Sequence, residues 1–414
     1  MRGWTFICLV ILVGALSGCG SSVSEDRSSD SGPQTAAAVD AASTTEPAEK
    51  TSTSETTAKA PATGPEGSTV KGNTSEEDTS EEKFALRTEE IPLQRPITTV
   101  GFGLGSLWLV DLGNYECDDT GGGAAACAAP RTIFLRALSP ESYEFSTRVP
   151  FKGSMDASVA FGAGSVWVSA IPQNPSSGGL FRVEPETGEV LSRLPVESST
   201  AVAFGEGSVW VTSEERGALL RVDPDTGETT AEIKASSGGA NDLAVGGGAV
   251  WVASWGPVSG PVGQDHFKGK KLVRVDPETG EVAAEVPIEQ NALEGGVSSV
   301  AVDDETGAVW ATSVNGKLFR VDPETNRIVA EVNLGDYAWK VETFAGDAWV
   351  IYETGINDPS GATQRVVRID SETNRPVGSM KVKNARDLAA GRDALWLTTS
   401  DVESGAGSLT RIVP

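Results

Sequence analysis

An apolar phrase built around one tryptophan recurs along this chain, and it limits the possible folds more than any other feature. The phrase reads GEGSVWVTS at residues 205–213, and variants of it occur six more times. Its tryptophans are Trp108, Trp167, Trp210, Trp251, Trp310, Trp349 and Trp396. They are separated by 59, 43, 41, 59, 39 and 47 residues. A unit that recurs at such intervals indicates a repeat architecture.

A second phrase follows each tryptophan, and most of its copies resemble LLRVDPDTGET at residues 219–229. Its proline presets φ at the second turn position, and its aspartate accepts local backbone hydrogen bonds. Its glycine, replaced by asparagine in two copies, takes the left-handed position. The phrase therefore predicts a tight hairpin turn between two strands.

Each unit reads as four short strands with period-2 alternation, which excludes helical repeats. Four-stranded units that recur every 40–50 residues or so are typical of a β-propeller. The sequence therefore predicts an all-β fold with seven blades. The last unit ends at LTRIVP and lacks a fourth strand, so residues near 87–93 are expected to complete it and close the ring. The repeated tryptophan is then a large apolar plug between adjacent blades.

The N-terminal part has a different composition. Arg2 precedes an apolar run at residues 4–16 that is too short for an ordinary membrane span. Leu16-Ser17-Gly18-Cys19 resembles a bacterial lipobox, which implies removal of residues 1–18 and acylation of Cys19. The alternative is an ordinary secretory signal with a chance cysteine. We expect a lipid-anchored protein on the extracytoplasmic side of the cell envelope.

Residues 20–83 contain no Phe, Trp, Tyr, Ile, Leu or Met. Such a segment cannot bury enough apolar surface to offset its chain entropy, so residues 19–83 are expected to form a disordered tether. Its Ser/Thr and Pro content fits either an O-glycosylated stalk or simple solvation. The folded domain is expected to cover residues 84–414.

The chain is strongly acidic, with a net charge of −25. Residues 1–83 hold 13 acidic and 6 basic side chains, so −7, and residues 84–414 hold 45 and 27, so −18. An acidic surface repels phosphate backbones and anionic head groups. Nucleic acid is therefore not an expected partner, and the lipid anchor is the expected contact with the membrane.

Two cysteines of the expected domain, Cys117 and Cys127, flank a short loop. In an oxidising compartment this spacing favours a disulfide bond. A metal site is the poorer interpretation, because no histidine or further cysteine lies nearby in the sequence.

The two repeated phrases, G-x-G-S-V-W-V-T and R-V-D-P-x-T-G-E, resemble those of the virginiamycin B lyase-type family of seven-bladed propellers and the related YncE-like surface propellers. The resemblance covers residues 87–414. It implies the fold, but its motifs are scaffold residues. The lyase branch is known for two histidines and a glutamate that act with magnesium, whereas this chain has a single histidine, His266. We therefore assign no catalytic residue and do not expect streptogramin lyase activity.

Propeller geometry places the long loops and the links between blades on one face, where function usually resides. Trp255 and His266 lie in the loop at residues 254–271. Counting back from each tryptophan predicts a polar ring at the mouth of the central channel. Besides serines and a threonine, it contains Asp156, Asn241, Asp242, Trp339, Lys340, Arg386 and Asp387.

This ring and loop predict a site for a protein, a peptide or a cell-envelope glycan. We expect a monomeric binding or scaffold module without a cofactor. Two alternatives stay open for the polar ring itself. It is either a ligand site or a solvated rim whose charges pair with each other. The alternative function is a metal-dependent lactonase or lyase at the mouth of the channel. It would need a calcium ion held by the oxygen atoms of Asp156, Asn241, Asp242 and Asp387.

Overall fold

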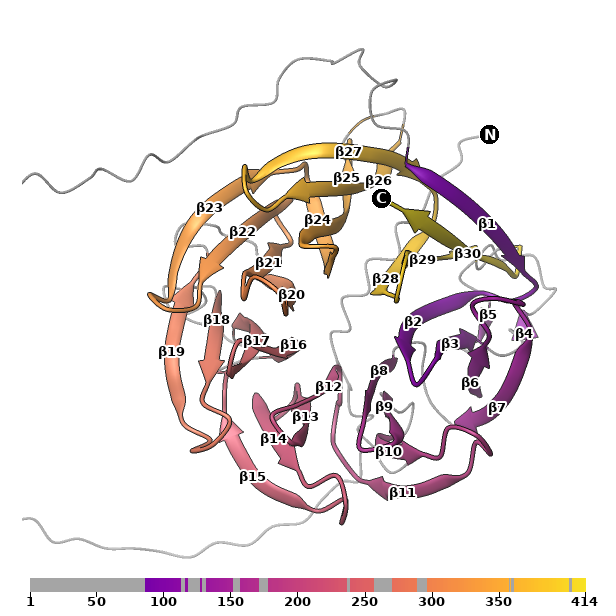
Figure 1. Cartoon of the computed structure of the whole chain (residues 1–414), viewed down its shortest axis with the longest axis horizontal. Coiled ribbons are helices and arrows are strands. Elements are labelled where there is room, and N and C mark those ends of the chain that lie inside the picture. The colour runs from indigo at the N-terminus through magenta and orange to yellow at the C-terminus, as the bar shows by residue number, and fades with distance from the viewer. Residues whose placement is uncertain are drawn as a thin grey trace, which may run out of the picture. The chain divides into compact units, whose positions relative to one another are not determined.

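The computed structural model describes residues 86–112, 116–117, 127–128, 132–151, 157–170, 178–236, 239–256, 270–288, 296–356, 358, 361–401 and 404–414. These residues form seven four-stranded antiparallel sheets arranged in a ring (Figure 1). The predicted seven-bladed propeller is confirmed. Within the described residues, no helix is long and apolar enough to cross a membrane.

Blades are numbered from the first complete one, and the strands of each run outward from the centre of the ring. Blade 1 is formed by β2 (Ile97–Gly103), β3 (Ser106–Leu112), β6 (Ile133–Leu138) and β7 (Phe145–Phe151). Blade 2 is formed by β8 (Ala157–Gly162), β9 (Ser165–Ala170), β10 (Gly179–Val183) and β11 (Val190–Leu194). Blade 3 is formed by β12 (Val202–Gly205), β13 (Ser208–Ser213), β14 (Ala218–Val222) and β15 (Thr229–Lys234). Blade 4 is formed by β16 (Gly239–Gly246), β17 (Ala249–Gly256), β18 (Lys270–Val275) and β19 (Val282–Pro287).

The remaining blades follow the same plan. Blade 5 is formed by β20 (Val297–Val302), β21 (Val309–Ser313), β22 (Lys317–Asp322) and β23 (Arg327–Asn333). Blade 6 is formed by β24 (Tyr337–Phe344), β25 (Asp347–Thr354), β26 (Thr363–Asp370) and β27 (Arg375–Val382). Blade 7 is formed by β28 (Ala385–Ala390), β29 (Leu395–Asp401), β30 (Ala406–Val413) and β1 (Arg87–Leu93).

The ring closes as the sequence predicts. β1 comes from the opposite end of the chain and pairs antiparallel with β30, from Arg87 opposite Val413 to Leu93 opposite Gly407. Figure 1 shows this indigo strand beside the yellow C-terminal strand. The pairing gives blade 7 its fourth strand and covers a sheet edge that would otherwise expose unpaired N–H and C=O groups.

The seven repeated tryptophans are plugs between blades, as predicted. All are 3 % exposed or less. Each packs against the next blade around the ring: Trp210, for example, shares a core cluster with Val250 and Val252 of blade 4. In blade 3 its Nε1 donates to the Gly205 carbonyl at 3.1 Å, and the Arg221 guanidinium lies 5.6 Å from the ring centroid. The arginine of the second phrase thus covers the tryptophan of the first.

The two glycines of the G-x-G turn have different tasks. Gly103 lies against blade 2, where an added Cβ would be 2.1 Å from the ring of Phe161. Gly105 has open space around it but a φ of +80°, which favours glycine. The first glycine therefore permits close packing of blades, and the second permits the turn.

The second phrase forms the predicted hairpin. Asp223 Oδ1 accepts hydrogen bonds from the backbone N–H groups of Asp225 and Thr226, at 3.0 and 2.8 Å. Gly227 follows with a φ of +72°. These bonds hold the pKa of Asp223 below its usual range, led by the bond from the Thr226 N–H.

The Cys117–Cys127 disulfide and the lipid anchor on Cys19 remain predictions. β4 (Glu116–Cys117) and β5 (Cys127–Ala128) pair antiparallel with Cys117 directly opposite Cys127. Directly opposed residues have Cα atoms about 4.5–5.5 Å apart, within the range that a disulfide spans. For these two pairs of residues the structure describes the backbone alone, and residues 1–85 with Cys19 lie outside the described residues.

Candidate functional site

The first strand of every blade lies at the centre of the ring, and the seven first strands can be aligned through the plug tryptophans. The residue paired with each tryptophan on the first strand is small in six blades: Gly101, Ala160, Ala203, Ala244, Ala301 and Ala389. In blade 6 it is Glu342. Two residues earlier, the same strands carry Thr99, Ser158, Ala201, Asp242, Ser299, Lys340 and Asp387. Six of these seven residues are polar, and we call the set the inner ring.

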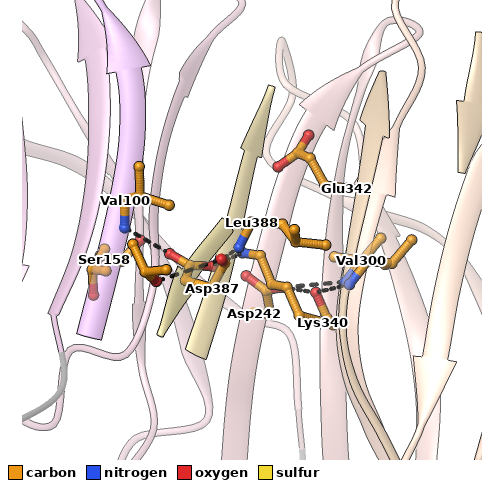
Figure 2. A network of polar contacts seen from close by, with 12 residues as sticks. Val100, Ser158, Asp242, Val300, Lys340, Glu342, Asp387 and Leu388 are labelled. Atoms are coloured by element: carbon orange, nitrogen blue, oxygen red, sulfur yellow. Dashed lines mark hydrogen bonds and ion pairs between the residues drawn. The ribbon is translucent and has the colours of Figure 1, made fainter. Parts of the chain in front are cut away.

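Several inner-ring side chains join one blade to the next. Asp387 Oδ2 accepts a hydrogen bond from Val100 N at 3.0 Å, which links blade 7 to blade 1. Asp242 Oδ2 accepts from Val300 N at 3.2 Å and from Ser299 Oγ at 2.7 Å, which links blade 4 to blade 5. Figure 2 shows both carboxylates in these contacts. Part of the predicted ligand ring therefore has a structural role that the sequence did not reveal.

Lys340 occupies the inner ring in blade 6 and pairs with the carboxylate of Asp387, at 3.2 Å from Nζ to Oδ1. Its side chain is 27 % exposed. Burial lowers the pKa of Lys340, but the neighbouring carboxylates of Asp387, Asp242 and Glu342 outweigh burial and raise that pKa above its usual value. The lysine is thus an ammonium held among carboxylates, and in this part of the ring two of the predicted site residues pair with each other.

Glu342 is the functional candidate that sequence reasoning missed. It lies two residues beyond Lys340 on β24 and is partly buried. Its Oε1 accepts a hydrogen bond from the N–H of Thr343 at 3.1 Å. Burial raises the pKa of Glu342 to about 7, helped by the charges of Asp387 and Asp242 and opposed by Lys340 and the Thr343 N–H. Aligning the first strands would have revealed Glu342, because a carboxylate there departs from six small residues.

The register of the first strands also shifts just before the inner ring in five blades. The extra residues at these bulges include Asn241, Trp339 and Arg386. A bulge changes the direction of a side chain and is common beside active sites. From its bulge in blade 4, Asn241 Nδ2 donates a hydrogen bond to the Ser298 carbonyl of blade 5 at 2.8 Å.

Trp339 packs on the core cluster between blades 6 and 7, as a partly buried side chain. Its ring stacks on that of Tyr337, with centroids 5.6 Å apart and an interplanar angle of 23°. Arg386 is the equivalent bulge residue of blade 7, and its Nε is buried without a hydrogen-bond partner within the described residues. Blade 6 therefore presents an aromatic pair where the other blades have polar or small residues.

Of the predicted site residues, Asp242, Lys340 and Asp387 come together at the centre of the ring (Figure 2). Asn241, Trp339 and Arg386 lie beside them on the same strands. Trp255 belongs to β17, the second strand of blade 4, and its side chain is outside the described residues. Asp156 and His266 are also outside them, so their part in a site stays a prediction.

The geometry bears on the metal interpretation. Asp242 and Asp387 already accept two or more hydrogen bonds each, some from backbone N–H groups. Within the described residues, no three His, Cys, Asp or Glu side chains are grouped so as to hold a metal ion. The described part of the centre is thus arranged for ion pairing and hydrogen bonding.

A separate hollow of about 260 Å³ lies on the tight-turn face, at the closing seam between blades 7 and 1. Tyr143 and Trp396 meet edge to face in it, with centroids 6.4 Å apart. The Tyr143 hydroxyl donates to Glu89 at 3.0 Å, and Arg411 pairs with Asp393 at 3.3 Å. Two of its charged residues, Arg411 and Asp393, pair with each other, and the hollow lies where the ring closes.

Comparison of the chain with protein-family models finds no matching family. Comparison with curated proteins finds no significant relative. The seven-bladed propeller is therefore established by its structure, and a function has to be argued from the residues of the site.

Proposed function

We propose that this chain is a binding module of the cell envelope, which captures a protein, a peptide or a glycan through the loop-rich face of its propeller. It is held on the extracytoplasmic side of a membrane by a lipid on Cys19, and a Cys117–Cys127 disulfide closes the first long loop. Its relatives by resemblance are the YncE-like surface propellers.

The observation that carries the proposal is the composition of β24. This strand reads YAWKVETF and places Tyr337, Trp339, Lys340 and Glu342 at the centre of the ring. Other first strands, such as ASVAFG and ARDLAA, carry fewer large or charged groups. A repeat scaffold does not need these residues in one blade only. Convergent polar groups next to partly buried aromatic rings are typical of ligand sites.

A ligand screen tests the binding function. The full chain is heated with peptides, cell-wall fragments, oligosaccharides and lactones, each with calcium, with magnesium and with chelator. A ligand at 100 times its Kd adds about 2.7 kcal/mol, and each kcal/mol moves the midpoint of a domain this large by about 2 °C. We expect a shift of a few degrees with a peptide or glycan that chelator leaves intact. Absence of any shift across the whole screen would contradict the proposal.

The anchor has its own test. Cys19→Ser should move the protein from the membrane fraction to the soluble fraction and abolish incorporation of radiolabelled palmitate. Cys8→Ser is the matched control, because Cys8 lies in the apolar run that is expected to be removed. Retention of the Cys19→Ser variant in the membrane fraction, without label, would show that something other than the lipid holds it.

One observation favours a second candidate, a lactonase- or lyase-type enzyme. Glu342 has a pKa of about 7 and lies close to the charges of Lys340, Asp387 and Asp242, so it could exchange a proton near neutral pH. Glu342→Gln should then abolish turnover of a lactone found in the screen. If turnover persists in Glu342→Gln, the enzyme candidate loses its only specific support.

A further inference from the structure

Four residues at the loop-rich end of blade 6 form a surface that the inner ring does not include. They are Asp336, Tyr337, Trp339 and Glu353, and we call them the blade 6 rim. Tyr337 is directly opposite Glu353 in the pairing of β24 with β25, so both side chains lie on the same face of the sheet. Trp339 packs toward blade 7 on that face, together with Ile351 and Ala385. The rim therefore borders the seam between blades 6 and 7.

The carboxylate of Glu353 has no cationic partner within the described residues. Glu353 is partly buried, and no side chain within the described residues donates a hydrogen bond to its carboxylate. Burial and the charge of Asp336 raise the pKa of Glu353. Asp336 is exposed and accepts a hydrogen bond from Ile356 N at 3.1 Å. Lys340 does not serve the rim, because it is paired with Asp387.

The aromatic pair gives this surface its chemistry. Tyr337 and Trp339 are stacked and partly buried, and Tyr337 is the cross-strand partner of Glu353. Burial raises the pKa of Tyr337, and the charge of Glu353 raises it further. An ammonium or guanidinium group is attracted by the face of an aromatic ring and by a carboxylate at the same time. A neutral or anionic ligand would leave the carboxylates unpaired. The net charge of −18 on residues 84–414 also favours the approach of a cation.

We propose that the blade 6 rim binds a lysine or arginine side chain of a peptide segment, with its charged end between Glu353 and the Tyr337–Trp339 pair. This inference rests on the proposed binding function and names the class of ligand. The peptide backbone would lie beside the seam between blades 6 and 7, which the rim borders.

The test uses fluorescein-labelled peptides of twelve residues in which serine alternates with lysine, glutamate or glutamine. Binding to the full chain is measured by fluorescence anisotropy at low and at physiological ionic strength. A tetramer of N-acetylglucosamine serves as a neutral glycan competitor. We expect the lysine peptide to bind most tightly, and we expect Trp339→Ala and Glu353→Gln each to weaken it at least threefold or so.

Glu324→Gln is the matched control. It also removes one negative charge, but Glu324 is exposed in the hairpin turn of blade 5 on the opposite, tight-turn face. A general attraction of the acidic protein for cations would weaken equally in both glutamate variants, which would overturn the proposal. Unchanged thermal midpoints confirm that each variant is folded.

The remaining outcomes separate the two proposals. If the glutamine peptide or the glycan binds as tightly as the lysine peptide and still needs Trp339, the cationic inference fails while the binding function stands. If the peptides and the glycan do not bind and the ligand screen is also empty, both fail.

Discussion

Two sets of seven residues face each other across the inner strands of this propeller. On the second strands the tryptophan is the same in every blade and is buried in every blade. On the first strands its partner is small in six blades, and in blade 6 it is Glu342. The first set is fixed by packing, because each blade has to fill the same gap to its neighbour. The second set lies on the innermost strands, where small residues such as Ala160, Ala301 and Ala389 are buried between blades. Blade 6 carries a carboxylate at this position, and the packing that the other blades share does not require one.

The largest expected effect tests the packing side of this comparison. Trp210→Ala removes a fully buried side chain and should lower the free energy of unfolding by about 3–5 kcal/mol. Trp339→Ala, which changes a partly buried tryptophan, should cost about 1–2 kcal/mol. Urea unfolding followed by circular dichroism measures both. Equal costs would show that Trp339 is a plug as well.

The next effect concerns Glu342 and pH. Its pKa is raised from 4.5 to about 7 in the folded chain, so at intermediate pH the folded state binds a proton that the unfolded state has lost. Stability from this group is complete below pH 4.5 and falls as pH rises through about 7. A shift of this size corresponds to at most about 3 kcal/mol, less where water screens the group.

Glu342→Gln should remove that loss, so the variant should be more stable than the parent at pH 8 and similar to it at pH 4. Glu331→Gln is the control, since Glu331 is an exposed partner of Lys317 on the outer strand of blade 5. Parallel stability curves for the parent and Glu342→Gln would contradict a raised pKa at this position.

A smaller effect distinguishes the two glycines of one turn. Gly103→Ala places a Cβ against Phe161 and should cost about 1–3 kcal/mol through strain between blades. Gly105→Ala meets nothing but keeps a positive φ, so its cost should be nearer 1 kcal/mol. Thermal unfolding compares them. If Gly105→Ala costs more stability than Gly103→Ala, the geometry of the turn matters more at this point than the packing of one blade on the next.

The smallest effect concerns the place where the chain ends meet. Arg182, Arg274 and Arg320 each donate to a carbonyl in the hairpin turn of the next blade. Arg368 of blade 6 faces blade 7, whose third and fourth strands come from the two chain ends, and it donates to Asp347 in its own blade at 2.6 Å. Blades 1 to 3 have serine at the position equivalent to Asp347, two residues before the plug tryptophan. Asp347→Ser should therefore lower the free energy of unfolding by about 1 kcal/mol, through loss of the bond to Arg368. Calorimetry detects a change of this size. An unchanged thermal midpoint would show that Asp347 does not replace the hairpin turn that blade 7 lacks and that Arg368 would otherwise contact.

Most of the fold could be predicted, because each strand and turn carries its own local pattern. The R-V-D-P-x-T-G-E phrase contains the residues that form its turn, and the unpaired end at LTRIVP required a strand from elsewhere. The candidate site was predicted only in part. Counting residues back from each tryptophan located Asp242, Lys340 and Asp387. The sequence around Asp387 and Asp242 does not show that these carboxylates accept hydrogen bonds from Val100 N and Val300 N of the neighbouring blades.

By itself, the sequence determined seven blades, their strand order and the closure of the ring, since spacing and turn chemistry act over a few residues. Only the tertiary structure decided what the centre of the ring contains. Lys340 forms an ion pair with Asp387 of the next blade, and the charge of Asp242, two blades away, also raises the pKa of Lys340. Glu342 owes its pKa of about 7 to burial among those groups. Such properties depend on distances between blades and on the exclusion of water, and these exist only once the ring has closed.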